Sequence, residues 1–441
     1  MVGKIAKNPQ LEVFKIPLVQ FIQESHELCV LANKIDWDSL EKDLSVYYTL
    51  NNGRPSIPIR KVAGVLLLRR IFNASDERAI EIWKENPYWQ YFCGEVYFQH
   101  KSPFDPTELI KFRKRIGQEG SERILKLSVD LFEIKQIEEK TVLVDTTVQE
   151  KNITYPTDAK LQKKIIEKCR SIAKNEHIVL RQSYKRILKQ LMIDQRFRSH
   201  PKRKKKAMAS ARKIKTIAGR LVRDLERKLT NAQFEKYANE FLIFNKILSQ
   251  EKYSTNKTYS IHEPEVKCIA KGKESKKYEY GNKTSLVKTI KSGIIVGALA
   301  FEENPYDGNT LEPQLEQVER LTGRTPKYAV VDRGYRGRKK ILDTEIITPK
   351  ILAKHKKYQR QKMRKLFRSR AGIEPIIGHI KRDHRMLINY LSGNQGDAIN
   401  TLLAATGFNM MKMLRRLKAE AKNLVIIIIR LIWYPKYLAF Q

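Results

Sequence analysis

Hydrophobic residues in the first third of the chain recur at helical spacing. Residues 57–72 (IPIRKVAGVLLLRRIF) predict an amphipathic helix. Ser75 suits the N-cap of a second helix that ends before Pro87. A third helix is expected after Asp105, because Asp is a preferred N-cap and the proline that follows it suits a first turn. We therefore predict a helical domain over residues 1–138.

Two β-branched runs predict buried strands that each lead to an aspartate. TVLV at 141–144 precedes Asp145, and YAVV at 328–331 precedes Asp332. Further strand-like runs lie between residues 259 and 304. Active sites in open α/β sheets gather at the carboxyl ends of strands. Both aspartates are therefore candidate site residues, although either alone would pass for an ordinary turn acid.

The stretch 367–381 (FRSRAGIEPIIGHIK) combines apolar and charged positions in a helical pattern. At about 100° per residue, Arg370, Glu374 and Lys381 fall on nearly the same face. We expect a helix that presents one carboxylate flanked by two cations. Pro375 would kink or start a helix, so the shared face is firmer for Glu374 and Lys381 than for Arg370. A solvated charged face on an ordinary helix would give the same pattern.

The charge of the chain indicates a polyanionic partner. Its 441 residues include 86 Lys and Arg against 48 Asp and Glu, a net charge of +38. A membrane is disfavoured because no apolar run reaches ~18 residues, and the longest candidate, 424–433, contains Arg430. We expect that run to form a buried helix or strand. The four cysteines lack C-x-x-C spacing and no signal peptide is visible, which fits a reducing cytosol.

Half of the net charge lies in residues 160–230, with 24 Lys and Arg against five Asp and Glu. Leu and Ile recur at helical spacing there, and HPKRKKK (200–206) lies between the helical runs. We expect a long helical hairpin with a basic tip that binds phosphate. A solvated helix pair is the alternative, but a solvated face normally mixes both signs. The basic residues of the third N-terminal helix are further candidates, for a DNA major groove.

Asp145, Asp332 and Glu374 come from separate elements of a strongly basic chain. Two divalent metals bound ~3.5–4 Å apart need carboxylates that converge in this way. Mg²⁺ takes a few carboxylates and completes its octahedron with waters and substrate phosphate oxygens. These three acids are therefore candidate catalytic residues and metal ligands.

The order of these acids resembles the DDE transposases of bacterial insertion sequences, and in particular the insertion-sequence-five group. The signature of that group around the third acid is Tyr, two residues, Arg, three residues, Glu, six residues and Lys. Phe367, Arg370, Glu374 and Lys381 have this spacing, with Phe in place of Tyr. Four longer segments also resemble the group: NPYDGNTL (304–311), VVDRGYRG (330–337), IEPIIGHIKRDHRM (373–386) and LSGNQGDAINTLLAATGFNMMKML (391–414).

The resemblance implies an α/β fold, an RNase H-like mixed sheet flanked by helices. An N-terminal helical domain and a basic helical insertion between the first and second strands complete it. The boundaries expected are 1–138 for the helical DNA-binding domain, 139–158 and 257–417 for the RNase H-like catalytic domain, 159–256 for the insertion, and 418–441 for a C-terminal tail.

The resemblance also implies DNA transposition. Such an enzyme binds the terminal inverted repeats of its element, cleaves there and joins the ends to target DNA, as a homodimer or a larger synaptic assembly in the bacterial cytoplasm, at the nucleoid. Asp145, Asp332 and Glu374 would hold two Mg²⁺ ions, with Mn²⁺ as a substitute. The implied contacts to double-stranded DNA are Arg370, Lys381, Arg333 and Tyr335 near the scissile phosphate, Lys111, Arg113, Lys114 and Arg115 in the N-terminal domain, and Lys202, Arg203, Lys204, Lys205 and Lys206 in the insertion.

Two other functions remain open at this point. An inactive or repurposed relative would act as a sequence-specific DNA-binding protein, although all three acids are present here. A basic RNA-binding or structural protein would explain the charge and would leave the two aspartates after strands without a role. Mg²⁺-dependent cleavage of DNA separates the first function from both alternatives.

Overall fold

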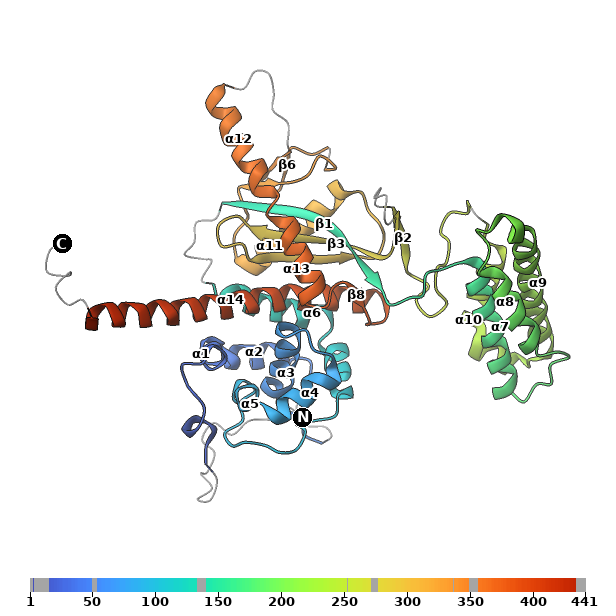
Figure 1. Ribbon diagram of the computed structural model, residues 1–441, viewed down its shortest axis with the longest axis horizontal. Coiled ribbons are helices and arrows are strands. Elements are labelled where there is room, and N and C mark those ends of the chain that lie inside the picture. The colour runs from blue at the N-terminus through green and yellow to red at the C-terminus, as the bar shows by residue number, and fades with distance from the viewer. Residues whose placement is uncertain are drawn as a thin grey trace. The chain divides into compact units, whose positions relative to one another are not determined.

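The computed structural model describes Gly3 and residues 16–49, 54–132, 140–251, 253–270, 277–335, 337–348 and 356–433, with side chains up to residue 422. It divides into two compact units (Figure 1). The first comprises Met1–Glu150 and Lys283–Gln441, and the second comprises Lys151–Asn282. Each unit is described by itself below.

The N-terminal region of the first unit is helical, as predicted. Its elements are η1 (Leu18–Gln20), α1 (Glu27–Lys34), α2 (Trp37–Ser45), α3 (Ile59–Ile71), α4 (Asp76–Glu85), α5 (Pro87–Phe92) and α6 (Thr107–Asp130). Ser75 caps α4 as predicted, because its side chain accepts the Arg78 N–H at 3.1 Å. The carboxylate of Asp105 accepts the Thr107 N–H at 2.9 Å at the start of α6. Helix α6 continues past Gly117, whose φ of +59° interrupts it.

The rest of the first unit is a mixed sheet with helices. Its strands are β1 (Thr141–Lys151), β3 (Tyr278–Thr289), β4 (Ile295–Phe301), β5 (Tyr328–Val330), β6 (Lys340–Ile341), β7 (Thr344–Ile347) and β8 (Ile388–Asn389). The order is β3-β1-β5-β7-β6, with β4 on β3 and β8 on β1. β5 is parallel to both β1 and β7, whereas β3 and β4 are antiparallel. The predicted mixed α/β class is therefore confirmed.

The remaining helices of this unit are η3 (Asp307–Thr310), α11 (Leu311–Thr322), α12 (Lys357–Arg370), α13 (Ile373–Asp383) and α14 (Gly393–Trp433). One hydrophobic core joins the N-terminal helices, the sheet and α14, and it includes Leu66, Val142 and Leu403. Gly407 of α14 lies against α3, where an added Cβ would be 2.9 Å from Arg70 Cβ. A larger residue at this position would push the two helices apart.

A buried polar network crosses the same core. The guanidinium of Arg70 donates to Asn400 Oδ1 at 2.7 Å and to the carbonyl of His384 at 3.2 Å. The amide of Asn400 donates in turn to Gln149 Oε1 at 2.6 Å, and the amide of Gln149 donates to the backbone carbonyl of Asp397 at 3.2 Å. Burial lowers the pKa of the Arg70 guanidinium. The network explains why Asn400 of the segment 391–414 is a buried amide, since its polar groups bind partners inside the core.

The described residues of the second unit form four α-helices, and three of them cover residues 160–230, so the prediction of a two-helix hairpin there is wrong. Its elements are α7 (Asp158–Asn175), α8 (Lys185–Gln195), η2 (Pro201–Arg203), α9 (Lys204–Lys228), α10 (Asn231–Ser249) and β2 (Lys267–Ala270), which pairs antiparallel with the first residues of β3. The helices bury a common core that includes Ile166, Leu221 and Phe244. Each helix has an apolar face that must pack against another helix, and the four apolar faces together form the core of one bundle.

Residues 418–433 belong to the last helix. α14 runs to Trp433, so most of the expected tail 418–441 is helical. The predicted burial of residues 424–433 lies outside the described side chains. No helix of the described residues combines the length and apolar character that a membrane span needs.

Candidate active site

The register of two parallel strands brings Asp145 and Asp332 together. Leu143 of β1 pairs with Val330 of β5, and each aspartate lies two residues beyond its strand's member of that pair. Because side chains alternate along a strand, the aspartates lie on the same face as Leu143 and Val330. The prediction that Asp145 ends its strand is wrong. β1 continues to Lys151 because β3 and β8 also pair with it.

An apolar cluster places the third acid over the same face. Ile373 is fully buried in a cluster with Leu143 and Val330, and Phe367 packs against that cluster. Helices α12 and α13 are thereby fixed beside the two aspartates. Glu374 follows Ile373 directly, so its carboxylate lies at the edge of this contact.

The expected single helix from Arg370 to Lys381 is wrong at its first residue. α12 ends at Arg370 and α13 begins three residues later, so Arg370 and Glu374 belong to different helices. Pro375 lies in the first turn of α13, where its missing N–H costs no helical hydrogen bond. The ammonium of Lys288 donates to the Gly372 carbonyl at 3.0 Å and holds the break in place.

The guanidinium of Arg370 lies among all three acids. Its Nη2 is 3.3 Å from Asp332 Oδ2 and 3.6 Å from Asp145 Oδ2, and its Nη1 is 4.0 Å from Glu374 Oε1. Its Nε is buried without a hydrogen-bond partner in the described part of the chain. The three carboxylates thus converge on one cation, and that cation is incompletely satisfied.

The two aspartates share a local geometry. Asp145 Oδ1 accepts the backbone N–H of Thr146 at 2.8 Å, and Asp332 Oδ1 accepts that of Arg333 at 2.6 Å. In both, one oxygen is held by the next residue and the other faces Arg370. Each aspartate therefore presents one oxygen to the same small volume.

The surroundings of Asp145 disfavour its negative charge. The pKa of Asp145 is raised to about 6, mainly by burial and in part by the negative charges of Asp332 and Glu374, although the Arg370 charge lowers it. The side chain of Asp145 is 15% exposed, against 47% for Asp332 and 67% for Glu374. A second positive charge at this position would stabilise the ionised site.

The donor set fits a hard divalent cation. Three carboxylates and no soft ligand are typical of Mg²⁺ or Mn²⁺ sites. In the present arrangement, no three His, Cys, Asp or Glu side chains of the described residues are close enough to hold a metal ion. The Arg370 guanidinium occupies the centre of the trio, so a metal there would have to displace it.

A turn within the segment 304–311, to which the sequence analysis assigned no role in the site, braces both aspartates. Asp307 Oδ1 accepts hydrogen bonds from Thr146 Oγ1 at 2.9 Å and from Lys283 Nζ at 3.0 Å. The hydroxyl of the adjacent Tyr306 donates to the carbonyl of Gly334, two residues after Asp332. The signal in the sequence was an acid and a tyrosine in NPYDG, between the two strands that carry the aspartates.

The other residues predicted near the scissile phosphate differ in exposure. Arg333 is exposed, and Lys381 is half-buried on α13, seven residues after Glu374 and therefore on nearly the same face. Tyr335 is 3% exposed in the core, and burial raises its pKa. Burial disfavours a direct contact between Tyr335 and DNA, since the turn after Asp332 directs this side chain inward.

The predicted basic helix in the N-terminal region is α6. Lys111, Lys114 and Arg115 are exposed on it, and Lys111 forms an ion pair with Glu108 at 2.6 Å. Arg113 is 3% exposed, and its guanidinium binds both oxygens of Asp76, at 3.0 and 2.6 Å. Its burial and its pairing with Asp76 disfavour a contact between Arg113 and DNA, because the helical period places Arg113 on the core face.

The basic tip predicted in the insertion spans η2 and the first turn of α9. All five cations are exposed: Lys202, Arg203, Lys204, Lys205 and Lys206. Two of them have partners within their own unit. Lys206 forms an ion pair with Asp194 at 3.3 Å, and the Arg203 guanidinium lies 4.4 Å from the ring centre of Phe197.

Comparisons with known proteins match two parts of the chain. Residues 17–115 match the family described as "Transposase domain (DUF772)", and residues 255–409 match "Transposase DDE domain". Asp332, Arg370, Glu374 and Lys381 lie within the second match, whereas Asp145 lies between the two.

A curated relative from Rhizobium meliloti, "Uncharacterized protein ORF8 in nfe locus", is 37% identical over 193 residues, which cover 43% of this chain and 93% of the relative. No solved structure matches the chain. The sheet that carries the acids is thus the RNase H-like fold that the DDE domain implies. The chain belongs to the DDE transposases of bacterial insertion sequences.

Proposed function

We propose that this chain cleaves DNA at the terminal inverted repeats of its element and joins the freed ends to target DNA, in a reaction that requires Mg²⁺. One observation carries the proposal. Asp145 and Asp332 are placed side by side by strand register, and both face the same guanidinium as Glu374. The insertion-sequence-five group remains the proposed subgroup.

The three acids would hold the metal through oxygens that the protein already orients. Asp145 and Asp332 each keep one oxygen on a backbone N–H, which leaves the other free for a cation. Bound divalent cations would activate the attacking water or 3′-hydroxyl and stabilise the leaving oxygen. Glu374 is the most exposed of the three and would close the site on the substrate side.

The cations around the site would hold the phosphodiester. When Arg370 leaves the acids, its planar guanidinium can bind two phosphate oxygens. Lys381 shares the face of Glu374 and would bind the backbone beside it. Arg333 follows Asp332 and is exposed on the same turn. These contacts fix the position of the strand and carry no sequence information.

The DNA outside the site would be held by the exposed cations of α6 and of the tip. Lys111, Lys114 and Arg115 are proposed for the first group and residues 202–206 for the second. Most such contacts are to phosphates, which supply affinity and salt dependence. We also propose that a homodimer or larger assembly brings two element ends together.

The decisive experiment measures strand nicking and strand transfer on end DNA, with and without Mg²⁺, for the wild type and Asp332→Asn. We expect Mg²⁺-dependent products from the wild type only. Binding of end DNA should persist in Asp332→Asn, because a negative charge near phosphate is removed. Binding without cleavage by the wild type would support a repurposed DNA-binding relative, and preference for RNA would support a structural RNA-binding protein.

A further inference from the structure

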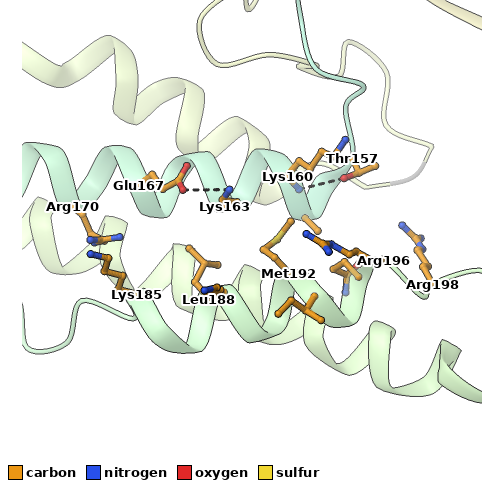
Figure 2. Close-up of a pocket in the computed structure, with 14 residues that line it drawn as sticks. Thr157, Lys160, Lys163, Glu167, Arg170, Lys185, Leu188, Met192, Arg196 and Arg198 are labelled. Atoms are coloured by element: carbon orange, nitrogen blue, oxygen red, sulfur yellow. Dashed lines mark hydrogen bonds and ion pairs between the residues drawn. The ribbon is translucent and has the colours of Figure 1, made fainter.

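A basic groove runs between α7 and α8 within the second unit (Figure 2). Its volume is about 840 Å³, and its apolar lining includes Leu188 and Met192. The cations that line it are Lys160, Lys163 and Arg170 from α7, Lys185 and Lys189 from α8, and Arg196 and Arg198 just after α8. Glu167 is the one acid among the lining residues, and it forms an ion pair with Lys163 at 3.5 Å.

The charge in this groove is not balanced by the protein. Arg170 and Lys185 point toward each other from opposite helices in Figure 2. Neither residue forms an ion pair with any acid of the described chain, and the same holds for Lys189, Arg196 and Arg198. Like charges that face each other raise the energy of the empty groove. An ordinary solvated face would mix both signs, so the arrangement favours an anionic ligand.

The dimensions indicate an extended ligand. From Thr157 to Arg170 the groove follows α7 for about 20 Å, at 1.5 Å per residue. One strand of B-DNA carries a phosphate for about every 3.4 Å of helix axis, so a strand that lies along the groove places roughly six phosphates in it. A single phosphate group would leave most of the cations without a partner.

We propose that the groove between α7 and α8 binds the sugar–phosphate backbone of DNA. The cations of both walls contact phosphate oxygens, and the apolar lining lies against the sugars. This inference rests on the proposed function, since it assumes that the chain acts on DNA. It also moves the main contact of the insertion away from the tip, where Arg203 and Lys206 already have protein partners.

The test compares two fourfold variants of the full chain. The groove variant carries Gln at Lys185, Lys189, Arg196 and Arg198. The control carries Gln at Arg212, Lys213, Lys215 and Arg220, which are equally exposed on α9 and do not line the groove. Both lose four charges in the same unit, so the difference between them measures position and not net charge.

Binding to a duplex of about 30 base pairs, roughly three turns, is measured by fluorescence anisotropy in EDTA over a range of NaCl concentrations. Each phosphate that the protein no longer neutralises should flatten the salt slope by about 0.9, so we expect a change of about 2 to 4 for the groove variant. Its affinity should drop at least about tenfold at low salt, and the slope of the control should change by less than half as much. Equal effects in both variants would overturn the proposal.

A second measurement needs no substitution. Acetylation of lysines in the wild type, read by mass spectrometry, should be slowed at Lys185 and Lys189 by DNA, and unchanged at Lys213 and Lys215. Unprotected groove lysines would overturn the proposal. So would protection by polyglutamate but not by DNA, because the groove would then belong to an acidic protein partner.

Neither measurement uses metal, so the two proposals fail separately. If the wild type does not cleave end DNA but DNA protects Lys185 and Lys189, the groove is a DNA site in a chain whose proposed reaction is wrong. If the wild type cleaves and the groove variant binds DNA as the control does, the reaction stands and the groove proposal is overturned.

Discussion

The hydroxyl of Thr146 donates a hydrogen bond of 2.9 Å to Asp307, although 161 residues of chain separate the two. The same carboxylate oxygen accepts a hydrogen bond from the ammonium of Lys283. The backbone N–H of Thr146 binds Asp145. Asp307 therefore braces the residue that orients the first acid of the site, and acts on the chemistry only through it.

Asp307→Asn should impair cleavage without weakening DNA binding. Loss of a residue that orients a metal ligand typically costs about 10–100-fold in metal affinity or activity. We expect the Mn²⁺ concentration for half-maximal cleavage to rise by a factor in this range. Asp343→Asn, at an exposed aspartate that pairs with Lys340, is the control. Equal metal dependence in the two variants would show that Asp307 does not position the site.

Arg370→Gln should increase metal affinity and reduce cleavage. The variant removes a positive charge that lies 3.3–4.0 Å from the three acids and competes with a metal for them. Mn²⁺ binding without DNA, measured by electron paramagnetic resonance, should tighten at least roughly fivefold, a modest share of the Coulomb energy at such distances. Arg368→Gln, on the exposed face of the same helix, controls for net charge. Weaker Mn²⁺ binding in Arg370→Gln would contradict the competition.

Arg113→Gln should destabilise the fold. It removes the bidentate partner of the largely buried Asp76 carboxylate, which keeps its ion pair with Arg69, so the loss should stay below the about 3–5 kcal/mol typical of a buried charge left wholly unpaired. Urea unfolding at pH 7 measures the loss. Lys114→Gln, one residue away and exposed, should unfold like the wild type. A stable Arg113→Gln protein with weakened DNA binding would instead make Arg113 a DNA contact.

The cost of Arg113→Gln should shrink in acid. Burial alone would raise the pKa of Asp76, but the hydrogen bonds from Arg113 and the charge of Arg69 outweigh it and lower that pKa. A lowered carboxyl pKa stabilises the fold above the ordinary value of about 3.9, and this stability is lost as the pH falls through the lowered value. Unfolding curves of both proteins at several pH values down to 3 or below, about a unit under the ordinary value, should therefore converge. A constant difference would mean that Asp76 is not the partner that matters.

Neutralising the tip should weaken binding to all DNA sequences alike. Replacing residues 202–206 with Gln removes exposed cations, and the salt slope should flatten by about 0.9 for each phosphate that these cations had neutralised. Two of the five already have protein partners, so the change should be smaller than in the groove variant. An unchanged slope would place the tip away from DNA.

Local sequence pattern predicted the strands at 141–144 and 328–331 because short β-branched runs need burial on both faces. It could not show that β1 continues to Lys151 through polar residues. Gln149, for example, is fully buried because it binds Asp397, which lies 248 residues later. A hydrogen bond of that kind depends on tertiary structure, and no window of neighbouring residues contains it.

The sequence pattern predicted the acids of the site, but it predicted the positions of the cations less well. Pro375 signalled a helix boundary, but a proline marks a start or a kink equally well, so the separation of Arg370 from α13 did not follow. Arg113 lies in a run of exposed cations, and only its contact with Asp76 shows that it is structural. Asp307 lies in a turn whose composition is common to many loops.

The core shared by the N-terminal helices, the sheet and α14 would determine how far along the DNA the acids lie from a contact at α6. Residues of α6, of the sheet and of α14 pack into this one core, so α6 and the two aspartates belong to the same compact unit. A duplex bound by α6 would therefore reach Asp145 and Asp332 at a constant distance from that contact. The fold would then set the number of base pairs between the DNA contact at α6 and the site of cleavage.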